Sequence, residues 1–527
     1  MVPYNEIKEN AYYDSVTLMV ISSKITSIDG IENAAVMMGT DHNKQLMKNS
    51  GLLLPENEKV GTSDMIIGIL AENQEAIDKA LELVNEELDN KKSGSSKGEV
   101  RVKTLDAAIN RMPGANFTVI SVPGKYAKNE AMKALDNGLH VLLFSDNVSL
   151  EEEIELKNKA IEKGLLMMGP DCGTTIINGT ALGFANGVNR GNIGMVAAAG
   201  TGLQEVTCIV DKLGGGISQA LGTGGRDLSD EIGGKMMLQC LNALATDEET
   251  EVIVLMSKPP SPAVMEKVLN VVKDIKKPVI TCFLGGDVAL VKSCGAIPAE
   301  TLEDAAAAAV RVAQGKKPEN LFFTVEDEEV RKIVNRETSK FKDEQKYIRG
   351  LYSGGTLCNE GTLIMKETIG DVYSNVPLKE ELELKDMEQS VENTFLDMGE
   401  DYFTDGLPHP MIDTRLRFER IKKEGQDSEV AVILLDIVLG YGCHEDPAGA
   451  LLPAITEAKE SAAREDRYIS VVASICGTDK DPQNRKEQEK KLIDAGVVVM
   501  PSNAQAARMA SLIVTKGKHL EELLGGE

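Results

Sequence analysis

The amino-acid sequence predicts a multidomain α/β protein with parallel sheets, preceded by a small α+β domain. A chain of 527 residues is too long for one hydrophobic core. Short apolar runs alternate with amphipathic stretches along most of the chain, which indicates strands separated by helices. This alternation favours parallel strands joined by right-handed crossovers, because each helix returns the chain to the edge where the previous strand began.

Residues 1–98 are expected to form the small α+β domain and a linker. The linker is predicted at Asp89–Gly98 (DNKKSGSSKG), which is polar and rich in Gly and Ser. An amphipathic stretch predicts a helix over Gln74–Leu88. Short apolar runs predict strands at Ser15–Ser22, Ala34–Met38 and Met65–Leu70.

Three α/β blocks follow at residues 99–168, 169–318 and 347–527, and the two longer blocks look like variations on one plan. The charged stretch at 319–346 is expected to be a connector with some helix. Helices are expected over Lys125–Asn137 and Leu150–Lys163. Strands are expected at Phe117–Val122, His140–Phe144, Leu165–Met168, Ile193–Ala197, Val252–Met256, Pro278–Phe283, Ile348–Tyr352, Val430–Leu435, Ile469–Ala473 and Val497–Val499.

The composition narrows the classes of partner and location. With 57 basic and 83 acidic residues the net charge is −26, which disfavours nucleic acid and anionic membranes as partners. The apolar runs are much shorter than a membrane span, and Met1–Asn10 is polar and acidic, unlike a signal peptide. Eight Cys without a C-x-x-C pair indicate a reducing compartment, and five scattered His predict no metal site. We therefore expect a cytoplasmic protein whose ligand is a small molecule.

The Gly-rich turn at 200–202 is the first candidate ligand site. A predicted strand runs directly into Gly200, Thr201 and Gly202, and a helix follows. Ligands of open parallel sheets bind at the carboxyl ends of strands. The unpaired N–H groups at a helix start attract anions, and Gly allows a ligand to approach closely. The alternative is a tight turn with a Thr cap and no ligand.

The second candidate is the turn Gly222–Ser229 (GTGGRDLS). Gly224 and Gly225 would expose backbone N–H groups, and Arg226 would add a fixed cation. Together these groups suit a carboxylate or a phosphate. The alternative is that Arg226 and Asp227 form a structural pair that holds the loop.

The third candidate lies at the end of the predicted strand Val430–Leu435, in a turn crowded with polar groups. Adjacent Cys and His suggest a nucleophile and its base, although neighbours in sequence rarely have the required geometry. Carboxylates here would repel a bare phosphate but could accept N–H bonds from an amide-like substrate. An Asp-Pro pair at 446–447 is typical of a helix start. The candidate residues are Gly442, Cys443, His444, Glu445 and Asp446.

One further histidine is a candidate catalytic residue. His409 lies between Pro408 and Pro410 in a long polar loop that leads into a predicted helix. Two flanking prolines restrict the backbone, so the ring is presented stiffly. The alternative is a solvated loop histidine.

These turns, in this order, resemble a known family. The segments Met168–Gly173, Gly191–Val196, Gly200–Gly202 and Gly222–Gly225 resemble the succinyl-CoA synthetase α-subunit. The segments Tyr352–Thr356, Phe395–Gly399 and Val430–Gly442 are similar to the carboxyl-terminal domain of the β-subunit. A single chain that carries both, led by the segments 14–16 and 36–40, resembles the FdrA family. The resemblance implies a truncated CoA-binding-like Rossmann domain and two flavodoxin-like ligase domains.

Departures from the synthetases limit what the resemblance implies. The synthetases use a phosphorylated His, whereas the corresponding stretch Lys292–Pro298 has none, and no His lies between His140 and His409. The synthetases also have a Glu that orients the phosphohistidine, and the corresponding stretch here, Met256–Pro260 (MSKPP), has no Glu. The Gly-rich CoA loop and an ATP-grasp module are also missing. A complete phosphohistidine-dependent CoA ligase is therefore hard to build from this chain.

Resemblance to the FdrA family implies a subunit of a carbamoyltransferase of purine (allantoin) catabolism. That enzyme interconverts oxalurate plus phosphate with oxamate plus carbamoyl phosphate. Facing helix starts from the two ligase-like domains would hold the phosphate, and we expect them at the turns 200–202 and 440–446. Arg226 and Lys258 would supply cations, and catalysis would depend on positioning and oxyanion stabilisation.

Two other functions stay open at this point. One is an acyl-CoA synthetase of the succinate–CoA ligase type, which would use CoA and ATP. The other is a non-catalytic regulatory subunit that binds phosphate or nucleotide. No cofactor is expected with certainty, since phosphate or carbamoyl phosphate would be a substrate. We expect a homo-oligomer that needs additional protein subunits to complete its site.

Overall fold

The computed structural model describes residues 1–527 except 10, 12, 14, 27, 94–101, 103, 321, 405–406 and 526–527. The chain forms two compact units, one of residues 1–102 with 400–413 and one of residues 103–399 with 414–527. Among the described helices, none combines the length and the apolar character that crossing a membrane requires.

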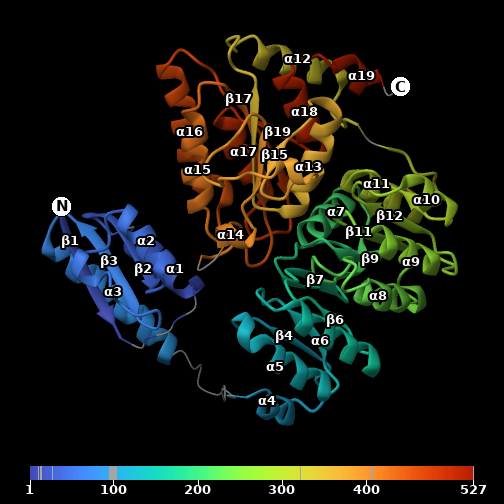
Figure 1. Ribbon diagram of the computed structural model, residues 1–527, viewed down its shortest axis with the longest axis horizontal. Helices are drawn as coiled ribbons and strands as arrows, with labels where there is room; N and C mark the ends of the chain where they lie inside the picture. Colours follow the sequence, from blue (N-terminus) through green and yellow to red (C-terminus); the bar gives the residue numbers. More distant parts are fainter. Residues whose placement is uncertain are drawn as a thin grey trace. The chain divides into compact units, whose positions relative to one another are not determined.

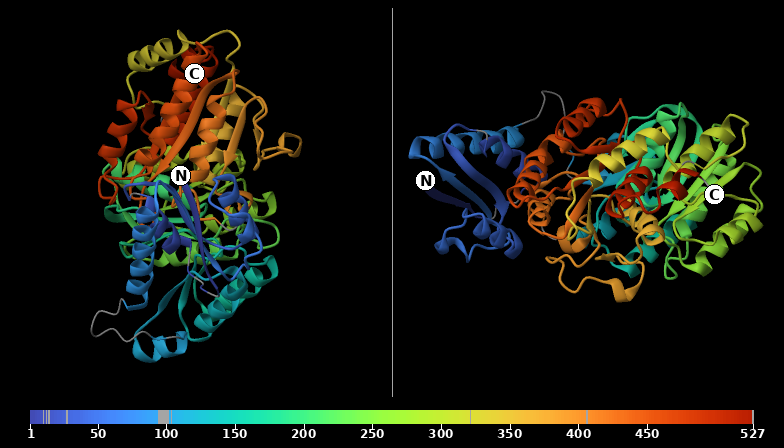
Figure 2. Two further views of the ribbon diagram at one scale, coloured as in Figure 1. Left: turned by 90° about the vertical axis from the view of Figure 1, so that its left-hand side faces the viewer. Right: turned by 90° about the horizontal axis from the view of Figure 1, so that it is seen from above.

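The smaller unit is built on an antiparallel three-stranded sheet in the order β1-β3-β2 (Figure 1 and Figure 2, blue). This confirms the small α+β domain that the sequence predicts. Its strands are β1 (Val2–Lys8), β2 (Ile31–Met38) and β3 (Met65–Ala71). Its helices are α1 (Ser15–Thr26), α2 (Asp41–Asn49), η1 (Pro55–Asn57), α3 (Gln74–Ser93) and α14 (Asp401–Thr404).

The strand predicted at Ser15–Ser22 is wrong, because this segment is helix α1. Its β-branched residues suggested a strand, but Leu18, Ile21 and Ile25 are buried at helical spacing. Two further corrections concern the ends of this unit. Strand β1 was not expected, and helix α3 continues to Ser93, into the predicted linker. Residues 94–98 of that linker lie outside the described residues.

The larger unit begins with a three-stranded parallel sheet in the order β4-β5-β6. Its strands are β4 (Phe117–Ile120), β5 (His140–Leu143) and β6 (Met167–Met168). Its helices are α4 (Leu105–Arg111), α5 (Gly124–Asp136) and α6 (Leu150–Lys163). Helix α6 begins at a capping box formed by Ser149 and Glu152, and its C-cap Gly164 has a φ of 68°. We call this part the Rossmann-like domain.

The first ligase-like domain has a seven-stranded sheet in the order β13-β12-β11-β9-β10-β7-β8, with helices on both faces (Figure 1). Strands β9 to β13 are parallel, and β7 and β8 form an antiparallel hairpin. The strands are β7 (Thr174–Ile177), β8 (Thr180–Gly183), β9 (Arg190–Ala198), β10 (Ile217–Gly222), β11 (Val252–Ser257), β12 (Val279–Phe283) and β13 (Ile297–Pro298). The helices are α7 (Gly200–Lys212), α8 (Lys235–Thr246), α9 (Pro262–Val272), α10 (Val288–Ser293) and α11 (Leu302–Ala313).

The second ligase-like domain repeats this plan with a six-stranded parallel sheet in the order β15-β16-β14-β17-β18-β19. When the hairpin β7–β8 and the short edge strand β15 are left aside, both sheets have the same order, with β9 between β10 and β11 and with β14 between β16 and β17. The strands are β14 (Tyr347–Tyr352), β15 (Tyr373–Ser374), β16 (Thr394–Asp397), β17 (Val430–Val438), β18 (Ser470–Cys476) and β19 (Val498–Met500). The helices are α12 (Asp327–Thr338) ahead of the sheet, α13 (Gly355–Thr368), η2 (Glu380–Leu382), α15 (Arg415–Gly425), α16 (Pro447–Arg464), α17 (Arg485–Asp494), α18 (Asn503–Val514) and α19 (Leu520–Gly525).

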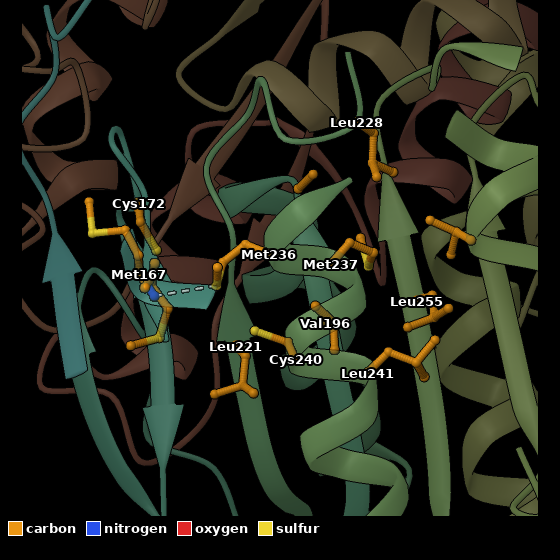
Figure 3. Close-up of a cluster of buried hydrophobic side chains, with 14 of the residues drawn as sticks. Met167, Cys172, Val196, Leu221, Leu228, Met236, Met237, Cys240, Leu241 and Leu255 are labelled. Atoms are coloured by element: carbon orange, nitrogen blue, oxygen red, sulfur yellow. Dashed lines mark hydrogen bonds between the residues drawn. The ribbon is translucent and has the colours of Figure 1, made fainter. Parts of the chain in front are cut away.

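A continuous apolar core joins the Rossmann-like domain to the first ligase-like domain. Figure 3 shows its centre, where Met167 of β6 packs with Met236 and Cys240 of α8. The N–H of Met167 donates to Met236 Sδ over 3.3 Å. The three-stranded sheet is therefore packed on its larger neighbour and buries a shared core with it.

A buried lysine strengthens the same junction. The Lys157 side chain in α6 is fully buried, and its Nζ lies 2.7 Å from Asp227 Oδ1 and 2.7 Å from Glu153 Oε1. It also donates to the carbonyl of Thr223 over 3.0 Å. Asp227 in turn accepts bonds from the first turn of α8, so the lysine links α6 to the start of α8.

Replacing this lysine should weaken the junction strongly. Lys157→Met would leave the buried Asp227 without its cation and Glu153 with Arg226 alone, and we expect a loss of about 3–5 kcal/mol in the free energy of unfolding. Urea unfolding followed by circular dichroism measures it. The control is Lys133→Met, which removes an exposed, solvent-screened ion pair to Glu130 and should change the free energy of unfolding little. Equal losses in the two variants would contradict the role given to Lys157.

Candidate functional site

Two helix N-termini, one from each ligase-like domain, meet in the larger unit. Helix α7 begins at Gly200 after strand β9, and helix α13 begins at Gly355 after strand β14. The N–H of Thr356 donates to Thr201 Oγ1 over 3.2 Å, which joins the first turns of the two helices. Neither helix has a side-chain N-cap. Their remaining terminal N–H groups thus suit an anion.

Small residues allow the two helix starts to approach. A Cβ on Gly202 would lie 2.8 Å from Thr356 Cγ2, and a Cβ on Gly354 would lie 3.0 Å from Thr201 Cβ. Larger side chains at these positions would push the helices apart. Gly200 has open space at its Cβ position and is exposed. The junction is therefore closely packed at Gly202 and open at Gly200.

A cation and a carboxylate lie beside the start of α13. Lys258 follows strand β11, and its Nζ lies 3.8 Å from Asp397 Oδ2 at the end of β16. A Cβ on Gly355 would come within 2.9 Å of Lys258 Nζ and closer still to the Asp397 carboxylate. The Lys258 side chain keeps 34% of its surface exposed. An anion at the helix starts would thus meet a partly hydrated ammonium.

Asp436, which the sequence analysis missed, orders the turn before α13. It lies within β17, is fully buried, and accepts bonds from Ser353 N (2.8 Å) and Gly354 N (2.8 Å). The buried Arg417 donates to Asp436 Oδ1 over 2.8 Å. A charged residue inside the apolar run Leu434–Val438 was the signal that could have identified it.

The second predicted turn is occupied by structural contacts. Arg226 Nη2 donates to the carbonyl of Val148 (2.8 Å) and lies 2.8 Å from Glu153 Oε2. Asp227 binds Lys157 rather than Arg226. Gly224, with a φ of 86°, packs on the backbone of Pro170, whereas Gly225 is exposed. Arg226 therefore bonds to the Rossmann-like domain, whereas the structural alternative drawn from the sequence was a pair with Asp227.

The third predicted turn does not supply the helix start that bonds to the first turn of α7, so the pairing expected from the sequence is wrong. The helix start that meets α7 belongs to α13, not to α16. The backbone of 440–446 packs on other segments: Tyr441 N donates to Ala185 O (3.0 Å) and Gly440 N to Gln483 Oε1 (3.2 Å). Asp446 caps α16 as predicted, accepting from Gly449 N over 3.1 Å.

The side chains of this turn are not arranged for covalent catalysis. Burial raises the pKa of the Cys443 thiol to about 12, so little thiolate forms at neutral pH. His444 Nδ1 accepts from Asp446 N over 3.0 Å, while Glu445 is exposed. Burial alone would raise the pKa of Asp446, but a 2.6 Å bond from Lys491 and further hydrogen bonds lower it. Gly442, also exposed, has a φ of 81°.

His409 belongs to the smaller unit, with residues 1–102. Its Nδ1 accepts from Met411 N over 3.2 Å, and its carbonyl accepts from Ile412 N and Asp413 N. The ring thus organises its own turn, as the flanking prolines suggested.

Comparison with protein families matches three parts of the chain. Residues 351–513 match the CoA-ligase family, residues 188–285 match the CoA binding domain, and residues 1–103 match the AllF heavy metal-associated domain. The first two matches fall on the second and first ligase-like domains. The third covers the sheet of the smaller unit and all of its helices except α14.

The residues of the N-terminal match do not fit a heavy-metal site. Soft metals prefer thiolate ligands, but the first cysteine of the chain is Cys172. Within the part of the chain that the structure describes, no group of three or more His, Cys, Asp or Glu side chains is placed to hold a metal ion.

Relatives of known sequence match the chain to different extents. The α-subunit 2 of succinate–CoA ligase (ADP-forming) from Archaeoglobus fulgidus is 31% identical over 28% of this chain and 52% of that subunit. The Staphylococcus epidermidis α-subunit is 27% identical over 35% of this chain and 61% of its own length. These two matches cover only about half to three-fifths of the subunits.

One relative covers almost the whole chain. The uncharacterized protein YahF from Escherichia coli is 47% identical over 512 residues, which is 97% of this chain and 98% of that protein. The similarity to YahF thus runs through all three matched regions of this chain. This protein therefore belongs to the FdrA family, as a succinyl-CoA ligase-like member that carries an AllF-type N-terminal domain.

Proposed function

We propose that this protein is a subunit of a carbamoyltransferase that interconverts oxalurate plus phosphate with oxamate plus carbamoyl phosphate. The observation that carries the proposal is the junction of α7 and α13, where two uncapped helix starts meet beside Lys258. No His lies between His140 and His409, so phosphate here would be a substrate and not a phosphohistidine. The AllF-type domain supports a role in allantoin degradation.

The charged groups at the junction favour a carbamoyl substrate over a simple acyl phosphate. Backbone N–H groups and Lys258 would hold the phosphate. The Asp397 carboxylate beside Gly355 would repel phosphate oxygens, but it can accept N–H bonds from a carbamoyl amide. A substrate that combines an anion with an amide therefore matches the groups present.

The proposed reaction needs no covalent enzyme intermediate. An oxygen of hydrogen phosphate attacks the carbamoyl carbon of oxalurate, and the bond from that carbon to the oxamate nitrogen breaks. The phosphate proton moves to that nitrogen, so charge and atoms balance. The helix starts would stabilise the negative charge that develops on the carbamoyl oxygen. The high pKa of Cys443 agrees with a mechanism that has no thiolate nucleophile.

An acid–thiol ligase is the second candidate, because the family matches name CoA at 188–285 and 351–513. One contact counts against CoA binding in the Rossmann-like domain. The carbonyl oxygens of Asp146 and Asn147 lie against Gly124, at the start of α5. In a Rossmann-like domain the pyrophosphate of a dinucleotide or of CoA binds at a strand-to-helix turn like the one at Gly124, where these carbonyl oxygens lie.

An activity assay separates these candidates from a non-catalytic subunit. We expect carbamoyl phosphate to form when the full chain, alone or with its operon-neighbour proteins, is mixed with oxalurate and phosphate. Parallel reactions contain succinate, ATP and CoA. Thioester formation without carbamoyl phosphate would support the ligase instead. Phosphate binding without either product would support a regulatory subunit.

Substitution at Gly202 should weaken phosphate binding. In Gly202→Ala the new methyl would press on Thr356 and separate the two helix starts, so we expect at least about tenfold weaker binding. The measurement is the rise in unfolding temperature caused by phosphate. Gly225→Ala is the control, because Gly225 has open space at its Cβ position. Equal phosphate stabilisation in both variants would exclude α7 from the site.

Lys258 should contribute to the same binding through its charge. In Lys258→Met we expect phosphate affinity to fall about tenfold, with a weaker dependence on salt, because a charge-assisted bond is lost. Isothermal titration calorimetry at two salt concentrations measures both effects. Lys276→Met, which removes an exposed lysine, matches the change in net charge. If both variants lose affinity equally, Lys258 acts only through net charge.

A further inference from the structure

Two buried carboxyl groups lie behind the candidate site at matching positions. Glu205 follows Gly200 and Thr201 in α7 at the same spacing at which Glu360 follows Gly355 and Thr356 in α13. Each is 1% exposed. The two helices that form the site therefore share the pattern Gly-Thr-x-x-x-Glu, one copy in each ligase-like domain.

Each of these carboxyl groups bonds to the opposite domain. Glu360 Oε1, in the second ligase-like domain, accepts from Leu302 N over 2.7 Å, and Leu302 begins α11 of the first. Glu205 Oε1, in the first domain, accepts from Asn503 N over 3.0 Å, and Asn503 begins α18 of the second. Acceptors at a helix N-terminus meet its unpaired N–H groups and its positive end. The two bonds thus cross the domain junction in opposite directions.

Asn503 connects the two crossing bonds. Its side-chain Nδ2 donates to Glu360 Oε2 over 2.7 Å and to the carbonyl of Leu357 in α13 over 3.0 Å. The backbone N–H of Asn503 is the group that Glu205 holds. The first residue of α18 therefore touches α7 through its backbone and α13 through its side chain.

We propose that Glu205 and Glu360 are positioning residues of the anion site, which set the spacing between the starts of α7 and α13. This inference rests on the proposed phosphate site. Neither carboxyl group touches the anion. If one domain slid past the other, the bonds at Leu302 and Asn503 would have to break before the two helix starts could separate.

The chemistry of the junction indicates that Glu205 and Glu360 act by fixing a distance and not by supplying a charge. Burial raises the pKa of Glu205, and it raises the pKa of Glu360 to about 8. Apolar side chains would stabilise a buried junction at least as well as buried ionisable groups. Directed hydrogen bonds fix a distance and an angle, which apolar packing does not. At Glu205, where one oxygen accepts the crossing bond, an amide of the same length should therefore serve nearly as well as the carboxyl group.

Glu303 offers a matched control at the same junction. It is 3% exposed, burial raises its pKa to about 7, and its Oε1 accepts from Gln505 Nε2 over 2.5 Å. It lies in α11 and bonds to α18, so it also crosses between the domains. Neither of those helices begins at the anion site.

The test compares side-chain length at the three positions in the full chain. Inorganic phosphate is titrated by calorimetry into Glu205→Asp, Glu360→Asp and Glu303→Asp, and unfolding temperatures are measured beside it. Removing one methylene at Glu205 or Glu360 should weaken phosphate binding about tenfold, because displacements near 1 Å at a positioned site are costly. Glu303→Asp should lower the unfolding temperature and leave affinity within about twofold.

Glu205→Gln completes the test, because it keeps the length and the oxygen that accepts from Asn503 N. Glu360 is left out of this comparison, because both of its oxygens accept bonds and an amide would keep only one of them. We expect Glu205→Gln to bind phosphate within about threefold of the unchanged chain. If Glu205→Asp does not fold, tenfold weaker binding in Glu205→Gln overturns the geometric role. Unchanged affinity in the Asp variants, or an equal loss in Glu303→Asp, also overturns it. An unchanged chain that binds no phosphate instead overturns the proposed function.

Discussion

The bond from Thr356 N to Thr201 Oγ1 is the contact on which the rest of the site depends. It joins two helix starts whose N–H groups would otherwise need water or a ligand. Everything around it maintains that approach. Glycines at 202 and 354 leave room for it, and Asp436 holds the preceding turn. Removing the Thr201 hydroxyl or the Asp436 carboxylate, or adding a side chain at Gly202 or Gly354, would move the two positive helix ends apart.

The two ligase-like domains share the order of their core parallel strands, but the turns after equivalent strands differ. The turn after β11 carries Lys258 in the first domain. The equivalent turn after β17 in the second domain, at 440–446, packs on the loop around Ala185. One edge of the junction is thus filled by protein. The other carries Lys258 and the Asp397 carboxylate, the two charged groups to which the proposed substrate would bind.

Glycine-rich turns proved ambiguous for a physical reason. A Gly allows close approach of a ligand, but it equally allows close approach of another backbone. At 200–202 and 353–355 that freedom brings two helix starts together. At Gly124 and Gly224 it admits neighbouring backbone, and at 226 the cation binds Glu153 of the adjoining domain. Sequence alone does not distinguish these uses.

The sequence by itself determined the α/β class, the small N-terminal domain, most strands and the absence of a His between His140 and His409, because these depend on local periodicity and residue identity. It misassigned α1, since β-branched residues mask a helical pattern of burial at Leu18, Ile21 and Ile25. Only the tertiary structure decided which helix start faces α7 and which cation lies beside it. Those choices follow from contacts between segments 155 residues apart, such as Thr201 and Thr356, where no local pattern operates.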